Sequence, residues 1–151
     1  MLPALKARQN DAYAARKLPA ETVREMVENG FFRILQPKRY GGFEMDPQVF
    51  FDVQMTLAEA CMSTAWVLGV LGCHPYQLAL FDDRAQKEIW GDNPDTLVSS
   101  SYQPVGKVEV VDGGFKLSGR WGFSSGKACV SCRRAAGLRW LRLALQSTNR
   151  L

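Results

Sequence analysis

Several kinds of site are excluded by what this 151-residue chain lacks. It contains no Gly-x-Gly-x-x-Gly motif, so a Rossmann-type dinucleotide site is not supported. It has one histidine and four cysteines. Cys129 and Cys132 are spaced like half of a zinc or redox motif, but no second pair and no nearby histidine supplies the remaining ligands. We therefore expect no metal site.

Neither secretion nor membrane insertion is indicated by the apolar segments. The amino terminus lacks the apolar core of a signal peptide, and the few scattered cysteines fit a reduced, cytoplasmic setting. Residues 61–81 contain no Lys, Arg, Asp or Glu and are long enough to span a bilayer. His74 and Pro75 would then lie near the bilayer centre, where polar groups are costly. We expect two buried helices joined near Pro75 instead.

The net charge of +4 arises at one end of the chain. Residues 127–151 hold six Lys or Arg and no acidic residue, whereas residues 1–126 carry a net charge of −2. A polybasic segment can bind nucleic acid or anionic lipid, but the body of the chain gives no reason to expect a nucleic-acid partner. Residues 139–145 could form a short basic helix. Equally, an arginine-rich sequence without acidic residues is typical of a shifted reading frame in GC-rich coding DNA.

Helical patterns fill the first 90 residues. Good helix formers occupy residues 3–16, and Pro19 and Gly30 are suited to begin and end a second helix. Asp46, followed by proline, predicts the cap of a third helix. Asp82 or Asp83 begins a last helix that ends near Trp90.

A fourth helix is predicted between Ser63, its expected cap, and Gly72. It is apolar on nearly all sides, and a helix of this kind belongs in the middle of a bundle. We therefore expect it to require neighbours on all sides, some of which a chain of this length would not supply.

After residue 93 the patterns are those of strands. Residues 107–111 and 115–118 flank an Asp-Gly-Gly hairpin signal, and residues 96–101 and 120–124 also read as strands. Helices followed by antiparallel strands predict an α+β fold. The expected organisation is a helical domain over 1–92, a partial β-domain over 93–126 and an atypical basic tail over 127–151.

An ordered series of short motifs resembles one family. The series includes Gly30-Phe31-Phe32-Arg33, Tyr40-Gly41-Gly42, Ser63-Thr64-Ala65-Trp66, His74, Ser99-Ser100-Ser101-Tyr102, Gly119-Arg120-Trp121 and Phe123-Ser124-Ser125-Gly126. Each motif is weak alone, but their order resembles the amino-terminal part of flavin-dependent monooxygenases built on the acyl-CoA dehydrogenase fold. The similarity is to the oxygenase components of two-component phenol hydroxylases, including the secosteroid and 4-hydroxyphenylacetate hydroxylases.

The resemblance implies a cofactor, partners and a site. Enzymes of this family use reduced FMN or FAD supplied by a separate flavin reductase, hydroxylate a phenolic substrate, and form homotetramers. By position, Trp66, Ser124 and Ser125 match residues that contact the flavin, and His74 and Ser100 match the pair that faces the phenol. Imidazole suits proton transfer because it takes up and releases protons near neutral pH. The family's carboxy-terminal helical bundle is missing, so we expect the chain to be inactive alone.

Plainer interpretations stand beside these assignments. His74 could be a packed histidine, Ser100 part of a polar strand, Ser124-Ser125 a turn, and Trp66 a core residue. The same layout also fits a fragment of an acyl-CoA dehydrogenase relative that oxidises thioesters, or a non-catalytic truncated remnant.

Overall fold

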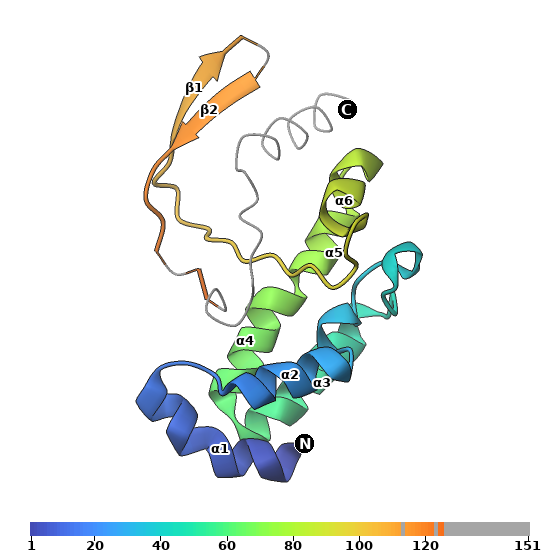
Figure 1. The fold of residues 1–151 in the computed structure, drawn as a ribbon, viewed down its shortest axis with the longest axis vertical. Coiled ribbons are helices and arrows are strands. Elements are labelled where there is room, and N and C mark those ends of the chain that lie inside the picture. Colours follow the sequence, from blue (N-terminus) through green and yellow to red (C-terminus); the bar gives the residue numbers. More distant parts are fainter. Residues whose placement is uncertain (113, 123, 126–151) are drawn as a thin grey trace.

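The computed structural model describes residues 1–112, 114–122 and 124–125, and it places helices first and antiparallel strands last (Figure 1). The α-helices are α1 (Leu2–Ala15), α2 (Ala20–Glu28), α3 (Pro47–Ala60), α4 (Met62–Gly72), α5 (His74–Ala79) and α6 (Asp83–Trp90). Two short 3-10 turns, Phe31–Arg33 and Lys38–Tyr40, lie between α2 and α3. The strands are β1 (Lys107–Val111) and β2 (Gly114–Ser118). The predicted α+β fold is confirmed.

Most of the predicted helix boundaries are confirmed, and local chemistry explains them. The Asp46 carboxylate accepts a hydrogen bond from the backbone N–H of Gln48 at 2.7 Å, which caps α3. Asp82 caps α6 in the same way, and Gly30 follows α2 with a φ of 72°, a left-handed conformation that suits glycine. The expected cap at Ser63 is wrong. A single extended residue, Cys61, separates α3 from α4, so α4 begins two residues earlier, at Met62, and has no side-chain cap.

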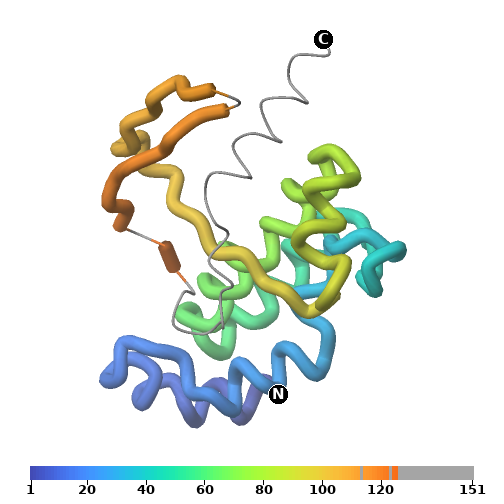
Figure 2. Tube along the Cα trace, turned by 45° about the horizontal axis from the view of Figure 1, so that its top comes forward, coloured from blue at the N-terminus to red at the C-terminus, as the bar shows by residue number. Residues whose placement is uncertain are grey.

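The core lies where α3 and α4 pack against each other, with α1 and the 3-10 turn at Phe31–Arg33 beside them (Figures 1 and 2). Close approach at one end depends on Gly72, since a Cβ atom there would come within 2.6 Å of the Phe50 ring. The predicted junction of two helices near Pro75 is confirmed. α4 ends at Gly72, and Pro75 lies in the first turn of α5.

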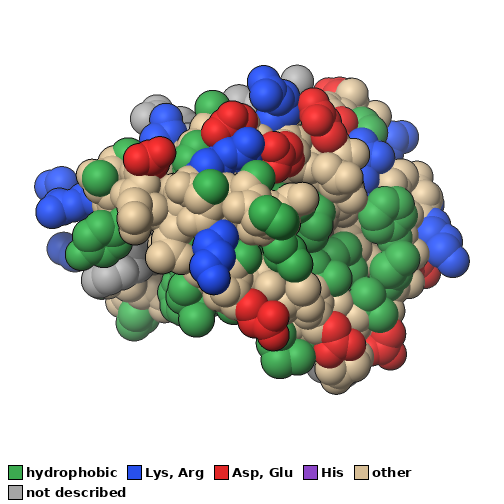
Figure 3. Space-filling view, turned by 90° about the horizontal axis from the view of Figure 1, so that it is seen from below, with side chains coloured by type: hydrophobic (Ala, Val, Ile, Leu, Met, Phe, Trp, Pro, Cys, Tyr) green, Lys and Arg blue, Asp and Glu red, His purple; other side chains and the backbone are tan. Residues whose placement is uncertain are grey.

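One side of α4 is open. Met62 is 67 % exposed and Trp66 is 61 % exposed, so Trp66 is not a core residue. Among the described residues, none covers this side of the helix. Apolar side chains also reach the surface on the face seen from below, where they lie between charged groups (Figure 3).

The hairpin of β1 and β2 is confirmed, with Val110 paired opposite Phe115. The predicted strands at 96–101 and 120–124 are wrong for the described residues, where the sheet has two strands. A strand needs a neighbouring ladder partner. Residues 93–106 instead run back past α5 and α4 in an extended path (Figures 1 and 2) and make their contacts through side chains.

Some expectations lie outside the described residues. These are the basic segment 127–151, the Cys129 and Cys132 pair, and the short helix at 139–145. The division into domains at 92 and 126 stays a prediction. Within the described parts of the chain, no helix has both the length and the apolar character needed to cross a membrane. Nor do three or more His, Cys, Asp or Glu side chains gather there as metal ligands would.

Candidate functional site

His74 and Ser100 are brought into hydrogen-bond contact. His74 is the first residue of α5 and is 5 % exposed. Its Nε2 lies 3.1 Å from the hydroxyl oxygen of Ser100, which is on the extended segment that runs past α5. Ser100 is itself exposed, so its hydroxyl stands between a buried imidazole and open space. This arrangement permits proton transfer between a ligand at Ser100 and the imidazole.

Two further residues of this cluster were missed from the sequence. The Oε1 atom of Gln77 lies 3.0 Å from His74 Nδ1, and the Gln77 amide also contacts the Tyr102 hydroxyl. Spacing could have identified both. Gln77 follows His74 by three positions, which puts the two side chains on one helix face, and Tyr102 follows Ser100 by two, which puts them on one side of an extended segment.

A second group of hydroxyls joins the segment after β2 to the segment before β1. The Ser99 hydroxyl lies 2.6 Å from the Ser124 hydroxyl and donates to the Ser125 carbonyl at 3.1 Å. Because Ser99 and Ser100 are adjacent, the serine contacts continue directly from the His74 pair. Ser99 was noticed in the sequence only as part of a polar run.

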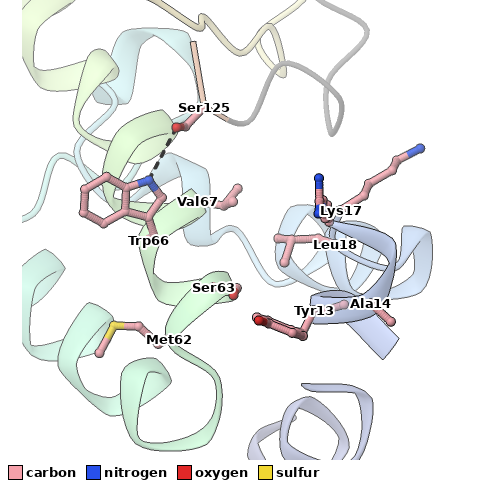
Figure 4. Close-up of a pocket in the computed structure, with 11 residues that line it drawn as sticks. Tyr13, Ala14, Lys17, Leu18, Met62, Ser63, Trp66, Val67 and Ser125 are labelled. Carbon is pink, nitrogen blue, oxygen red and sulfur yellow. Dashed lines mark hydrogen bonds between the residues drawn. The ribbon is translucent and has the colours of Figure 1, made fainter. Parts of the chain in front are cut away.

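Trp66 and Ser125 meet on the open side of α4. The indole Nε1–H of Trp66 donates to Ser125 Oγ at 3.4 Å (Figure 4). The two residues line a cavity of about 720 Å³ between α4 and the end of α1. Tyr13 and Lys17 bound it on the α1 side, and Ser63 faces them from α4 (Figure 4). The cavity therefore has an aromatic wall, a hydroxyl and a cationic rim.

A second cavity lies on the other side of the serine contacts. Its volume is about 600 Å³, and it is lined by Ser100 and Ser124 together with Leu117 and Trp121. The hydroxyls of the two groups thus border two cavities, one beside Trp66 and one beside Ser100.

Cys73 adds a neutral sulfur beside the imidazole. Its Sγ lies 3.8 Å from His74 Nδ1, and its thiol donates to the Val70 carbonyl at 3.6 Å. Burial raises the pKa of the Cys73 thiol above its ordinary value, although a backbone hydrogen bond at the same residue opposes the shift. The thiol is therefore uncharged at neutral pH.

The residues around Trp66 fit a flavin. A flavin ring system is flat and largely apolar, with hydrogen-bonding atoms along one edge, and such ligands need an apolar wall with a few well-placed polar groups. Trp66 offers exposed aromatic surface that packing does not use. Ser125 lines the same cavity and offers a hydroxyl, which donates and accepts without adding charge, and Ser124 offers another from the neighbouring cavity.

The family is shown by comparison with known proteins. Residues 4–92 match the family model of the acyl-CoA dehydrogenase N-terminal domain. The chain belongs to this family.

The proteins to which the chain is similar include oxygenase components of hydroxylating enzymes. The chain is 47 % identical over 126 residues to the oxygenase subunit HsaA of a flavin-dependent monooxygenase from Mycobacterium tuberculosis, covering 83 % of this chain and 32 % of that protein. It is 43 % identical over 126 residues to the oxygenase component of p-hydroxyphenylacetate 3-hydroxylase from Acinetobacter baumannii, covering 83 % of this chain and 30 % of that protein.

Comparison with solved structures finds similarity to proteins of the same kind. The crystal structure of the Mycobacterium tuberculosis HsaA monooxygenase matches with a TM-score of 0.83 and 46 % identity, over 86 % of this chain and 36 % of that one. XiaF from a Streptomyces species, solved with FADH2 and glycerol, matches with a TM-score of 0.76 and 27 % identity, over 83 % of this chain and 32 % of that one. The chain thus spans about a third of the length of these relatives.

Proposed function

We propose that this chain is part of the oxygenase component of a reduced-flavin-dependent aromatic hydroxylase, and that it supplies one wall of the flavin and substrate site. The observation that carries the proposal is the set of contacts His74–Ser100, Ser99–Ser124 and Trp66–Ser125. These contacts gather all five residues selected from the sequence. The relatives described above are flavin-dependent oxygenase components or bind FADH2, which supports the same assignment.

The flavin side of the proposed site is the cavity beside Trp66. When bound, reduced FMN or FAD supplies the electrons that activate molecular oxygen. Trp66 would pack against the ring system and Ser125 would hold its polar edge by a hydrogen bond, while Ser124 would contact the flavin from the side of the Ser100 cavity. In the longer relatives, residues beyond the matched third of the chain are available to close such a site and exclude water. We therefore expect weak flavin binding and no hydroxylation by the chain alone.

The substrate side is the cavity beside Ser100. A phenolic hydroxyl there would donate a hydrogen bond to Ser100, and His74 would accept a proton through that serine. Removing the phenol proton raises the electron density at the ring carbon that is to be hydroxylated. A separate flavin reductase is the expected protein partner, a phenol the expected substrate, and a homotetramer the expected assembly of the longer protein.

Anaerobic calorimetric titration of the 151-residue chain with reduced FMN and with reduced FAD tests the flavin side. Trp66→Ala is expected to weaken binding by about fivefold to tenfold, because an aromatic stacking partner is lost. Met55→Ala is the matched control. Met55 is an exposed apolar residue on α3 that does not line the cavity. Equal affinities for wild type and the Trp66 variant would place any flavin elsewhere and refute this part of the proposal.

A further inference from the structure

We propose that Gln77, held in place by Tyr102, is a positioning residue that fixes His74 in the tautomer with its hydrogen on Nδ1. Nε2 is then left to accept the Ser100 hydroxyl hydrogen. Gln77 and Tyr102 are both exposed, and neither lines the cavity beside Ser100. The inference concerns how His74 is prepared, and its consequence for the substrate rests on the proposed function.

The surroundings of Nδ1 favour a hydrogen on this atom. The nearest side-chain atom is Gln77 Oε1 at 3.0 Å, which can only accept. The other neighbour is the Cys73 sulfur at 3.8 Å. Because the Cys73 thiol donates its hydrogen to Val70, the sulfur turns lone pairs toward the imidazole. Two acceptors therefore face Nδ1, and a hydrogen bond forms only if the imidazole donates.

The Gln77 amide group is anchored by Tyr102. The Tyr102 hydroxyl lies 2.9 Å from Gln77 Nε2 and 3.0 Å from Gln77 Oε1. Its ring also lies beside the imidazole, with the ring centroids 6.4 Å apart. An oxygen has two lone pairs, so Oε1 can accept from both His74 Nδ1 and the Tyr102 hydroxyl.

Nε2 has a partner that can adapt. Among the described residues, the side-chain partner of this atom is the Ser100 hydroxyl, which can donate or accept. With the hydrogen of the neutral imidazole on Nδ1, Ser100 must donate to Nε2. The Ser100 oxygen then presents its lone pairs to the cavity of about 600 Å³. The site would favour a ligand group that donates a hydrogen, such as a phenol O–H, over an ether oxygen that only accepts.

The proton step balances on these atoms. The phenol O–H bond breaks as its proton passes to the Ser100 oxygen, and the original Ser100 hydrogen passes to His74 Nε2. The products are a phenolate and an imidazolium, so the total charge is unchanged. Gln77 Oε1 continues to accept the Nδ1 hydrogen of the imidazolium. The same acceptor thus selects the reactive tautomer and stabilises the charged form.

Nitrogen NMR of the imidazole tests the tautomer directly. His74 is the one histidine of the sequence, so the 15N-labelled chain gives one pair of imidazole nitrogen signals to assign. In mildly alkaline buffer, the wild type is expected to show mainly the Nδ1–H tautomer. Gln77→Leu should lower the ratio of Nδ1–H to Nε2–H by about fivefold to tenfold, the effect of one ordinary hydrogen bond. Tyr102→Phe should lower it by less.

Three further variants separate positioning from general structural damage. Gln77→Glu keeps an acceptor oxygen and should retain the Nδ1–H tautomer. Tyr76→Phe removes a hydroxyl from the same helix without touching the cluster and should change nothing. Ser100→Ala should also leave the tautomer unchanged, because Gln77 sets it.

The inference is overturned if the wild type shows the Nε2–H tautomer, or if Gln77→Leu leaves the ratio unchanged. It is also overturned if Ser100→Ala, and not Gln77→Leu, changes the tautomer, because Ser100 would then set it. These results are independent of hydroxylation. The tautomer can be established even if the proposed function fails. The proposed function can likewise hold even if the tautomer proves to be the other one.

Discussion

The indole nitrogen of Trp66 donates to the hydroxyl of Ser125, a residue 59 positions later in the chain. The bond connects the open side of α4 with the segment that follows β2. Together with the serine contacts and the His74 pair, it makes one continuous border for two cavities. The candidate site is therefore assembled from α4, α5 and two extended segments.

Replacing Ser99 tests whether the serine contacts hold the two extended segments together. Ser99→Ala removes the hydrogen bonds to Ser124 and to the Ser125 carbonyl. We expect the free energy of unfolding to fall by about 1–2 kcal/mol, measured by urea denaturation. Ser101→Ala is the control, since Ser101 accepts only a long bond of 3.4 Å from a backbone N–H. An equal loss in both variants would contradict a special role for Ser99.

The close contact between α3 and α4 predicts a difference between two glycines of one helix. Gly72→Ala would drive a methyl group into the buried Phe50 ring and should destabilise the protein by about 1–3 kcal/mol. Gly69→Ala meets only the end of the flexible Gln54 side chain, and alanine favours the helix, so its cost should be small. Thermal unfolding of both variants checks this. If the Gly69 variant is the less stable one, the packing of α3 on α4 is described wrongly.

Helix positions could be predicted from the sequence because their signals are local. The carboxylates of Asp46 and Asp82 cap the first turns, and Gly30 ends a helix, whatever the rest of the chain does. The hairpin was equally local. The strand predicted at 96–101 failed because pairing depends on a distant neighbour that the described residues do not provide.

The site residues also differ in whether a local sequence signal could identify them. His74 and Ser100 were found through a family resemblance, and their contact needed the path of residues 93–106, which no local pattern gives. From its residue type alone, Trp66 was predicted to lie in the core. Its exposure follows from the absence of a covering element among the described residues, which amphipathic periodicity could not reveal because the helix is apolar on nearly all sides.

The buried thiol of Cys73 predicts a pH dependence. Burial raises the pKa of Cys73 above its ordinary value of 9.0, so the folded protein keeps the thiol hydrogen where the unfolded chain has begun to lose it. The free energy of unfolding should therefore fall as the pH rises above 9, and it should fall less in Cys73→Ser. Denaturant titrations between pH 8 and 10, about the ordinary thiol value, measure the difference. Identical slopes for the two proteins would contradict a raised pKa.

Exposed apolar side chains on α3 and α4 predict self-association. Phe51 and Met55 lie one turn apart on α3, and Met62 and Trp66 lie one turn apart on α4, all of them exposed. Sedimentation velocity should show a mass that rises with concentration. The double change Met55→Gln and Met62→Gln should reduce this rise, whereas Lys6→Gln should not. A chain that stays monomeric at all concentrations would show that this surface does not drive association.

The central claim is that His74 and Ser100 move the substrate proton, and a hybrid oxygenase tests it most directly. Residues 1–125 would replace the matching segment of the Acinetobacter baumannii p-hydroxyphenylacetate 3-hydroxylase oxygenase component, with 3-hydroxylation measured in the presence of its reductase. The hybrid is predicted to form product. His74→Gln and Ser100→Ala should each lower the rate by about 100-fold or more, while Tyr76→Phe leaves it unchanged. Rates that are the same with and without the His74 and Ser100 changes would contradict the account.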